Sequence, residues 1–359
     1  MRAIVVTKRG DCRADASILQ LSDVAEPPPF NASSSSGLLL RVLACGWTPG
    51  DLKVMKGAIV KATGAYVPGL EVCGVVEAVG AKARGTFQVG DRVIAVLRPM
   101  SLSANNGGMA EHVVVESELA AKIPAAFRSE EAAVLPFAGV MAAKAIKDIA
   151  LKPGARVLVL GASSLTGSLV VQLVRSVGGA SFVAGTTPNA ELVASLALDQ
   201  VIVDDNQQDK WWEALRGQEM DAIIDCMGEA SEQWRRADHV LKPSSSSVLA
   251  TLVSEIASDG DVQPASHLLT LGVVNLWKSL WRLGGRTPKL VTVGAFPSTA
   301  SLEGAIQLVV ENKMRVPMDP NAPFAFKTEA VVHAVTLQRT HQARGGLAFV
   351  VRADQEQQS

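Results

Sequence analysis

The residues with the most recognisable chemistry form a short turn rich in glycine and hydroxyl side chains. Gly161 and Gly167 bracket this turn, which follows an apolar run at 157–160 and precedes a helical run at 168–173. A nucleotide pyrophosphate binds backbone N–H groups at a helix amino terminus, and it needs small side chains there so that the backbone can come close. The strand–turn–helix context favours this role over an ordinary tight turn. The residues predicted to contact the cofactor are Ser163, Ser164, Leu165, Thr166 and Gly167.

The end of the next apolar strand bears on which nucleotide would bind. The sequence there is Ala184-Gly185-Thr186-Thr187-Pro188-Asn189, without the carboxylate that hydrogen-bonds the ribose of NAD. Thr186 and Thr187 can donate hydroxyl hydrogen bonds to a 2′-phosphate, so both are predicted to contact the cofactor and NADPH is favoured over NADH. These residues are equally typical of a helix cap, and the segment has no Arg or Lys to pair with a phosphate.

Helical and apolar runs alternate around the turn. Helical patterns at 129–149, 167–177 and 189–198 alternate with short apolar runs at 156–160, 182–184 and 200–203. This βαβαβ alternation predicts a parallel sheet. Further strands are expected at 222–225, 247–252 and 290–293, followed by a helix at 302–312.

The first third of the chain has a different pattern. Short β-rich runs separated by turn residues lie at 3–7, 37–44, 73–79, 92–96 and 110–115. They predict a β-rich lobe. A proline run at 27–29 and a serine run at 33–36 are expected to form a surface loop, because neither can continue a strand ladder. With 359 residues, the chain is long enough for about two domains.

The composition excludes several classes of partner. Lys and Arg total 34 against 35 Asp and Glu, so no phosphate-neutralising surface is expected and nucleic acid is excluded as a partner. The four cysteines form no C-x-x-C pair, so neither a zinc knuckle nor a disulfide framework is predicted. A reducing compartment fits this cysteine usage best.

Two stretches of the sequence indicate whether the chain spans a membrane and in which compartment it is located. The run 157–174 has no charged residue over 18 positions, but small and hydroxyl residues in its middle favour a strand that turns into a helix over a transmembrane span. The amino terminus enters an apolar β-branched run directly, without a visible signal or transit segment. A cytoplasmic protein is therefore expected, with a mitochondrial location left open.

Several ordered motifs carry a resemblance that covers nearly the whole chain. The segment 42–51 resembles V-x-A-x-G-x-N-P-x-D, 67–76 resembles P-G-x-[DE]-x-x-G-x-V, 89–93 resembles G-D-R-V, and 107–112 resembles G-G-x-A-E-Y. These patterns are similar to those of the medium-chain dehydrogenase/reductase superfamily, in its zinc-free quinone oxidoreductase branch. The segments 221–225, 250–253 and 343–345, with Trp234, resemble the reticulon-4-interacting protein type.

The resemblance implies a fold and a division of the chain. The fold class is α/β, a Rossmann doubly wound parallel sheet plus a GroES-like β-rich lobe, with a substrate cleft where the two meet. The implied domains are a GroES-like catalytic lobe at 1–127, a Rossmann nucleotide-binding domain at 128–296, and a segment at 297–359 that returns to the catalytic lobe.

The resemblance also bears on metal chemistry. Zinc-dependent members of the superfamily hold their metal with Cys, His and a third ligand, and Thr48 and Leu70 match the first two positions. Leucine cannot bind zinc, so no zinc site is expected. Without a Lewis acid, hydride transfer to an activated, conjugated acceptor remains feasible. Reduction is therefore expected over alcohol oxidation.

Thr48 and Asp51 are the catalytic residues that the resemblance implies. Thr48 stands at the family's Asn position and could donate its hydroxyl to an acceptor carbonyl or to the nicotinamide ribose. A turn role before Pro49 is equally plausible for it. Asp51 is more typically a helix cap than a catalytic group. Further cofactor contacts are implied for Cys226, Thr251, Ala343 and Gly345.

The predicted function is NADPH-dependent, zinc-independent hydride transfer to a quinone or another conjugated carbonyl compound. Enoyl-thioester reduction is an alternative, although Ile59 stands where related reductases have a proton-donating tyrosine, and Tyr66 is expected to pack. A nucleotide-poor scaffold is another, motivated by Leu165 in the phosphate turn and by Gly346 where the family often has lysine.

An apolar, aromatic stretch at 268–281 has roughly helical spacing. It could line the cleft for a prenylated quinone or touch a membrane surface. Burial under the nucleotide sheet or in a dimer contact is at least as plausible. A monomer and a homodimer both remain open.

Overall fold

The computed structural model describes most of the chain. The described residues are 1–28, 35–57, 64–187, 193–194, 196, 198–203, 211–227, 233, 236–252, 288–294, 296–340 and 342–352. The chain divides into two compact units. The first comprises Met1–Val140, Phe296–Glu311 and Val316–Ser359, and the second comprises Met141–Ala295 and Asn312–Arg315. The domain boundaries predicted after residues 127 and 296 stay a prediction.

The first unit is built on a seven-stranded sheet with the order β14-β15-β3-β4-β5-β7, in which β6 also pairs with β3. β1 and β2 form a separate antiparallel pair. The strands are β1 Arg2–Val6, β2 Leu19–Asp23, β3 Gly37–Trp47, β4 Glu71–Val79, β5 Arg92–Val96, β6 His112–Glu116, β7 Ala120–Lys122, β14 Phe324–Ala325 and β15 Leu347–Val350. The β-rich lobe predicted from the first third of the chain is confirmed.

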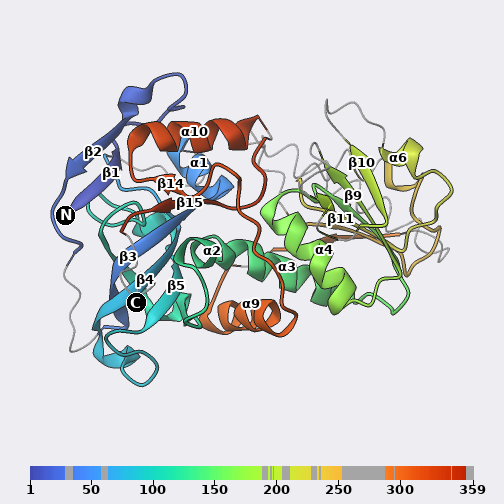
Figure 1. Cartoon of the computed structure of the whole chain (residues 1–359), viewed down its shortest axis with the longest axis horizontal. Coiled ribbons are helices and arrows are strands. Elements are labelled where there is room, and N and C mark those ends of the chain that lie inside the picture. Colours follow the sequence, from blue (N-terminus) through green and yellow to red (C-terminus); the bar gives the residue numbers. More distant parts are fainter. Residues whose placement is uncertain are drawn as a thin grey trace. The chain divides into compact units, whose positions relative to one another are not determined.

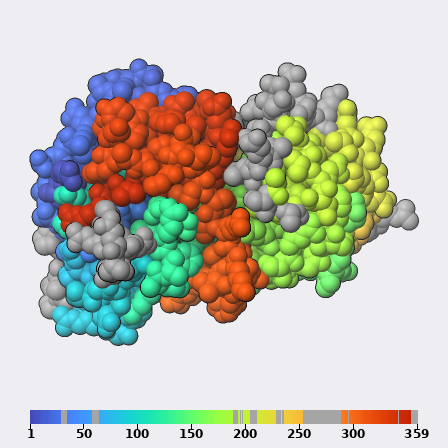
Figure 2. Space-filling model, viewed as in Figure 1, coloured from blue at the N-terminus to red at the C-terminus, as the bar shows by residue number. Residues whose placement is uncertain are grey.

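The two ends of the chain meet in this sheet. β15 runs antiparallel to β3, and the register pairs Leu347 with Trp47 and Val350 with Ala44. Phe349 of β15 is fully buried, with the ring of Phe324 at 5.3 Å. Burial of one such side chain stabilises a fold by about 1.5–3 kcal/mol. The C-terminal segment, red in Figures 1 and 2, therefore packs on the blue and cyan strands of its own unit.

The helices of the first unit are α1 Pro49–Met55, α2 Ser129–Ala133, α9 Thr299–Glu311 and α10 Thr328–Arg339, and α3 Leu135–Ile149 begins in it. Short 3₁₀ turns lie at Ala16–Ile18, Ala81–Ala83, Pro99–Ser101 and Ser117–Leu119. The single helix predicted at 129–149 is wrong in one respect, because it is interrupted at Val134. Pro136 has no N–H to donate to a preceding turn, so it fits a first helical turn better than a helix interior.

The second unit contains a six-stranded parallel sheet with the order β10-β9-β8-β11-β12-β13 (Figure 1). Its strands are β8 Arg156–Leu160, β9 Phe182–Thr187, β10 Gln200–Val203, β11 Ala222–Asp225, β12 Val248–Thr251 and β13 Lys289–Thr292, and its described helices include α4 Leu165–Ser176 and α6 Trp211–Ala214. Numbered in chain order, the strands follow the order 3-2-1-4-5-6 of a doubly wound dinucleotide-binding sheet. The strand order reverses between β8 and β11, while all the strands stay parallel. The predicted α/β fold class is confirmed.

The uncharged run at 157–174 falls within β8, the following turn and α4. Among the helices of the described residues, none is both long and apolar enough to cross a bilayer. The apolar stretch 268–281, for which a cleft or membrane contact was considered, lies outside the described residues.

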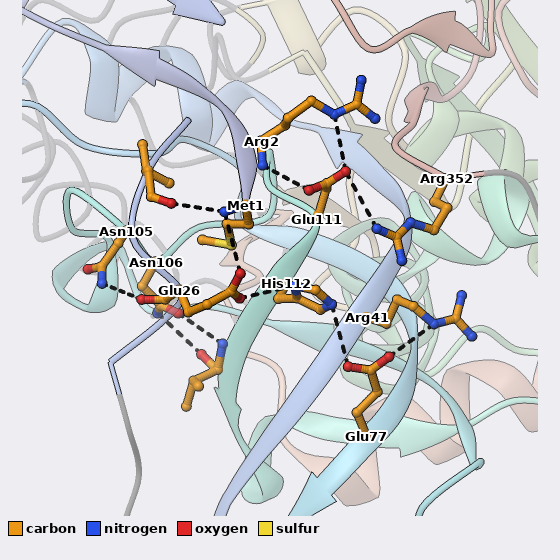
Figure 3. Close-up of polar contacts among 12 residues, drawn as sticks. Met1, Arg2, Glu26, Arg41, Glu77, Asn105, Asn106, Glu111, His112 and Arg352 are labelled. Carbon is orange, nitrogen blue, oxygen red and sulfur yellow. Dashed lines mark hydrogen bonds and ion pairs between the residues drawn. The ribbon is translucent and has the colours of Figure 1, made fainter. Parts of the chain in front are cut away.

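A carboxylate ties both chain ends to the sheet of the first unit. Glu111 accepts a hydrogen bond from the backbone N–H of Arg2 at 2.8 Å, and its side chain pairs with Arg2 at 3.1 Å and with Arg352 at 3.5 Å (Figure 3). The hydrogen bond from the Arg2 backbone holds the pKa of Glu111 below its usual value. Glu111 thus fixes the start of β1 and the segment after β15 at one place.

Beside it, His112 lies between two carboxylates (Figure 3). Its Nδ1 is 3.2 Å from Glu26 and its Nε2 is 3.4 Å from Glu77, which also pairs with Arg41 at 3.2 Å. These contacts join the segment after β2 to β6, β4 and β3.

We predict that Glu111→Gln lowers the free energy of unfolding by about 1 kcal/mol at neutral pH, because both arginines are partly exposed and screening limits the gain from each pair. Urea denaturation of the variant and of Glu118→Gln, an exposed control, measures the effect. The pKa of Glu111 is lowered in the folded state, so its contribution is present at neutral pH and is lost as the pH falls below the usual range of glutamate. An equal loss in both variants would contradict the role of Glu111.

Candidate functional site

The turn between β8 and α4 is held by hydrogen bonds within itself. Ser164 is the N-cap of α4, and its hydroxyl accepts from the Gly167 N–H at 3.0 Å and donates to the Gly161 carbonyl at 2.8 Å. Gly161 has φ +75°, a conformation that favours glycine. A Cβ on Gly167 would lie 2.1 Å from the Gly161 carbonyl oxygen. Glycine at 167 is therefore what allows the helix to approach the strand.

The first N–H groups of α4 are available to a ligand. Ser164 supplies the acceptors for Gly167, through its hydroxyl, and for Ser168, through its carbonyl. Within the described residues, the N–H groups of Leu165 and Thr166 have no hydrogen-bond acceptor, and both residues are partly exposed. Unpaired N–H groups at a helix amino terminus attract an anion. Leu165 therefore fits a pyrophosphate contact through its backbone, whatever its side chain.

The threonines at the end of β9 lie close to the same turn. Thr186 is buried, its hydroxyl accepts from the Gly161 N–H at 2.9 Å, and its carbonyl accepts from Ala162. Thr187 is 1 % exposed. Both residues are thus enclosed by the protein, and the Thr186 hydroxyl helps to hold the turn that follows β8. A direct contact of either residue with a 2′-phosphate stays a prediction, and Asn189 lies outside the described residues.

The ends of β11 and β12 carry a second hydrogen-bonded group. Asp225, fully buried, accepts from the Met227 N–H at 2.8 Å and from the Thr251 hydroxyl at 3.1 Å. Cys226 between them is partly exposed. Because β8, β9, β11 and β12 are parallel, their carboxyl ends share one edge of the sheet, and the predicted cofactor residues of the second unit lie along that edge.

In the first unit, Thr48 and Asp51 form a reciprocal cap at the start of α1. The Thr48 hydroxyl accepts from the Asp51 N–H at 3.3 Å, and Asp51 Oδ2 accepts from the Thr48 N–H at 2.9 Å and from its hydroxyl at 2.8 Å. The other carboxyl oxygen of Asp51 accepts from the Gly69 N–H at 3.0 Å. The helix-cap role expected for Asp51 is what the structure describes, and it joins α1 to the segment before β4.

A second carboxyl, which the sequence reasoning missed, lies in the same part of the unit. Glu71 is 1 % exposed, and its carboxyl accepts a hydrogen bond from the Phe137 N–H of α3 at 2.6 Å. Burial raises the pKa of Asp51 to about 6 and the pKa of Glu71 well above its usual value, and the charge of Asp51 adds to the rise at Glu71. Burial and both carboxyls also raise the pKa of the Cys45 thiol. The acidic position in the P-G-x-[DE] motif, set among apolar residues, was the available sequence signal.

The remaining residues of this region pack. Leu70, at the matching position of a zinc ligand, is 2 % exposed, and Tyr66 is buried with its pKa raised mainly by burial. In the described part of the chain, no group of three His, Cys, Asp or Glu side chains is arranged to hold a metal ion. Ile59, used above against a thioester reductase, lies outside the described residues.

Ala343 and Gly345 precede β15 in the first unit, at the same end of the β3–β15 ladder as Thr48, because Leu347 pairs with Trp47. Gly345 has φ +93°, and a Cβ on Gly346 would lie 2.7 Å from Val134. A side chain at 346 would therefore meet Val134, and glycine fits this position. The two units hold separate sets of predicted site residues.

Comparison with known proteins agrees with this architecture. Residues 34–125 match the alcohol dehydrogenase GroES-like domain. A solved structure, the quinone oxidoreductase from Coxiella burnetii, has a TM-score of 0.76 at 21 % identity and covers 98 % of this chain and 99 % of its own. The chain is similar to proteins of the medium-chain dehydrogenase/reductase superfamily. The Escherichia coli quinone oxidoreductase complexed with NADPH has the same fold, with a TM-score of 0.73 at 18 % identity over 98 % of this chain and all of the other.

Proteins of similar sequence differ in how much of their length they share with this chain. The 2-methylene-furan-3-one reductase of Solanum lycopersicum is 34 % identical over 60 % of the chain, which spans about half, 54 %, of that relative. The chloroplast envelope quinone oxidoreductase homolog of Arabidopsis thaliana is 27 % identical over 84 % of the chain and 87 % of the relative. The mitochondrial NAD(P)H oxidoreductase RTN4IP1 of Danio rerio is 29 % identical over 76 % of the chain and 68 % of the relative. The predicted likeness to that protein type is confirmed.

We predict that Glu71→Gln becomes more stable than the unchanged chain as the pH rises. Glu71 has a raised pKa, so the folded state holds a proton that the unfolded state releases at lower pH, and stability is lost as the pH rises above the usual range of glutamate. Glutamine keeps an acceptor for the Phe137 N–H without this proton. The difference in Tm between variant and unchanged chain should therefore grow from pH 5 to pH 8. Glu303→Gln, exposed on α9, should show no such trend, and a flat difference for Glu71→Gln would contradict the prediction.

Proposed function

We propose that the chain is an NADPH-dependent oxidoreductase that reduces a quinone or another conjugated carbonyl compound without zinc. The observation that carries this proposal is the turn at 161–167, which leaves unpaired N–H groups at the start of α4. The turn follows β8, beside the point where the strand order of the doubly wound sheet reverses. A scaffold protein would need neither the open helix terminus nor the close helix–strand approach at Gly167.

The names of the relatives support the acceptor class. They include a furanone reductase and a quinone oxidoreductase homolog, and both names describe carbonyl compounds conjugated to a double bond. The structural neighbour from Escherichia coli was solved with NADPH, which supports the phosphorylated nucleotide. Leu70 and Thr48, at the two matching ligand positions, support a reaction without zinc.

Different residues of the chain would bind the nucleotide and the acceptor. Bound NADPH would supply the hydride. The N–H groups of Leu165 and Thr166 would hold its pyrophosphate, with Ser163, Ser164 and Gly167 shaping the turn. The segments that end at Thr186, Cys226 and Thr251 would line the rest of the nucleotide along the sheet edge. In the first unit, the partly exposed Thr48 would contact the acceptor carbonyl, and Ala343 and Gly345 would contact the cofactor through the backbone beside β15.

We predict that Leu165→Glu weakens NADPH binding at least about tenfold, because a carboxylate in the first turn of α4 repels the pyrophosphate that its N–H groups attract. Leu165 is partly exposed, so the fold should tolerate the change. Titration of purified protein, followed by nicotinamide fluorescence, measures the Kd for NADPH and for NADH.

Val177→Glu, at the exposed carboxyl end of the same helix, is the matched control and should bind as the unchanged chain does. Absence of binding to either nucleotide in the unchanged chain would overturn the proposed function and favour a scaffold.

We also predict turnover of 9,10-phenanthrenequinone or of an α,β-unsaturated ketone with NADPH, and at least about tenfold lower kcat/KM for crotonyl thioester. Oxidation of NADPH measured at 340 nm checks both, and dialysis against a chelator should leave the rates unchanged. A preference for the thioester would replace the proposal by enoyl-thioester reduction.

A further inference from the structure

The Thr48 hydroxyl has one proton to donate, and a contact within the protein already uses it. Thr48 Oγ1 donates to Asp51 Oδ2 over 2.8 Å, and it also accepts the Asp51 N–H at 3.3 Å. While Asp51 is ionised, a Thr48 that turned its proton toward an acceptor would leave two lone pairs facing each other across 2.8 Å. Donation from Thr48 to a substrate therefore requires a proton on Asp51.

Burial of Asp51 favours that proton. The side chain is 1 % exposed, and although the backbone N–H groups of Thr48 at 2.9 Å and Gly69 at 3.0 Å stabilise the carboxylate, burial outweighs them. Three acids lie in the same buried region and interact with its charge: Cys45 at the end of β3, Tyr66, and Glu71 at the start of β4. The charge of an ionised Asp51 raises the pKa of each of these three acids, and desolvation disfavours that charge. The burial that raises the pKa of Asp51 to about 6 acts in the same direction.

We infer that Asp51 and Thr48 form a proton relay to the carbonyl oxygen of the acceptor, in which protonated Asp51 donates to Thr48 Oγ1 and Thr48 donates its own proton to the substrate. This inference rests on the proposed function. Thr48 is then the catalytic residue, because it touches the acceptor. Asp51 is a positioning residue and proton reserve that acts through Thr48.

The step balances with the groups named. The hydride of the proposed reaction brings an electron pair from the dihydronicotinamide to the acceptor, whose carbonyl oxygen becomes negative. The Thr48 O–H bond breaks as an O–H bond forms on that oxygen, and the Asp51 O–H bond breaks as the Thr48 hydroxyl is restored. Asp51 remains as a carboxylate and regains its proton from water through Thr48, which is the partly exposed member of the pair.

Donation to the acceptor depends on a proton on Asp51 because this chain has threonine at position 48. The motif that 42–51 resembles has asparagine at the position of Thr48, and an amide NH₂ carries two protons. Asparagine could donate to Asp51 and to an acceptor at the same time, whatever the ionisation of Asp51. A threonine cannot, so only the threonine chain should need the extra proton.

The pH dependence of kcat/KM tests the relay. For the unchanged chain, kcat/KM for phenanthrenequinone should fall about tenfold per pH unit above the pKa of Asp51, because one proton is required. Thr48→Ser, which keeps a single-proton hydroxyl, should show the same fall. Thr48→Asn should be flat from pH 6 to pH 9, and Thr48→Val should be at least about tenfold slower at pH 6. Asp51→Asn would set an NH₂ against backbone N–H groups and disturb the cap of α1, so the substitutions are made at Thr48.

A second readout does not depend on turnover. Binding of phenanthrenequinone to the protein saturated with NADP⁺ should raise the pKa of Asp51, and so take up a fraction of a proton per quinone between pH 6 and pH 7 in the unchanged chain and close to none in Thr48→Asn. A pH indicator in weakly buffered solution measures this uptake. Equal profiles and equal uptake for the two chains would overturn the relay while leaving the proposed function intact. Absence of any NADPH binding would instead overturn the proposed function itself.

Discussion

A buried carboxyl group, that of Asp51, holds together the part of the first unit on which the proposed chemistry depends. It gathers hydrogen bonds from Thr48, at the end of β3, and from Gly69, just before β4. Removing a carboxyl from water is unfavourable unless its oxygens are satisfied, so the two segments must stay in place around it. Glu71 extends the arrangement to the start of α3 through Phe137. Two strands and two helices are thus positioned by two acidic side chains.

The second unit relies on a different constraint, the absence of a side chain. α4 can lie against β8 only because Gly167 has no Cβ, and the turn can bend only because Gly161 adopts a positive φ. Thr186 from the neighbouring strand then fixes the Gly161 N–H. The first turn of α4 is left with N–H groups directed away from the protein's own acceptors. The anion site that we propose would thus be built from backbone alone, and a leucine at 165 is compatible with it.

The fold was largely predictable because hydrophobic periodicity records which elements are buried. The strands at 92–96, 156–160, 200–203 and 222–225 were predicted with the bounds that the structure gives. β2 was missed because Leu19–Asp23 is mostly exposed and pairs only with β1, so its sequence lacks a buried face. Residue placement at the site was less predictable. The Thr186 hydroxyl binds the Gly161 N–H, and Glu71 is enclosed, through contacts between segments far apart in the chain. The pattern of neighbouring residues in the sequence does not record such contacts.

The pairing of β15 with β3 also has a consequence for synthesis of the chain. The sheet of the first unit needs residues 347–350, which leave the ribosome after the whole of the second unit. The second unit lies between them in sequence, and domains generally fold as units during translation. The second unit can therefore complete its fold while the first still exposes the open edge of β3 and the pocket that Phe349 will fill. A ribosome that stops before residue 347 would release a chain with an unfinished sheet, a natural substrate for chaperones and proteases.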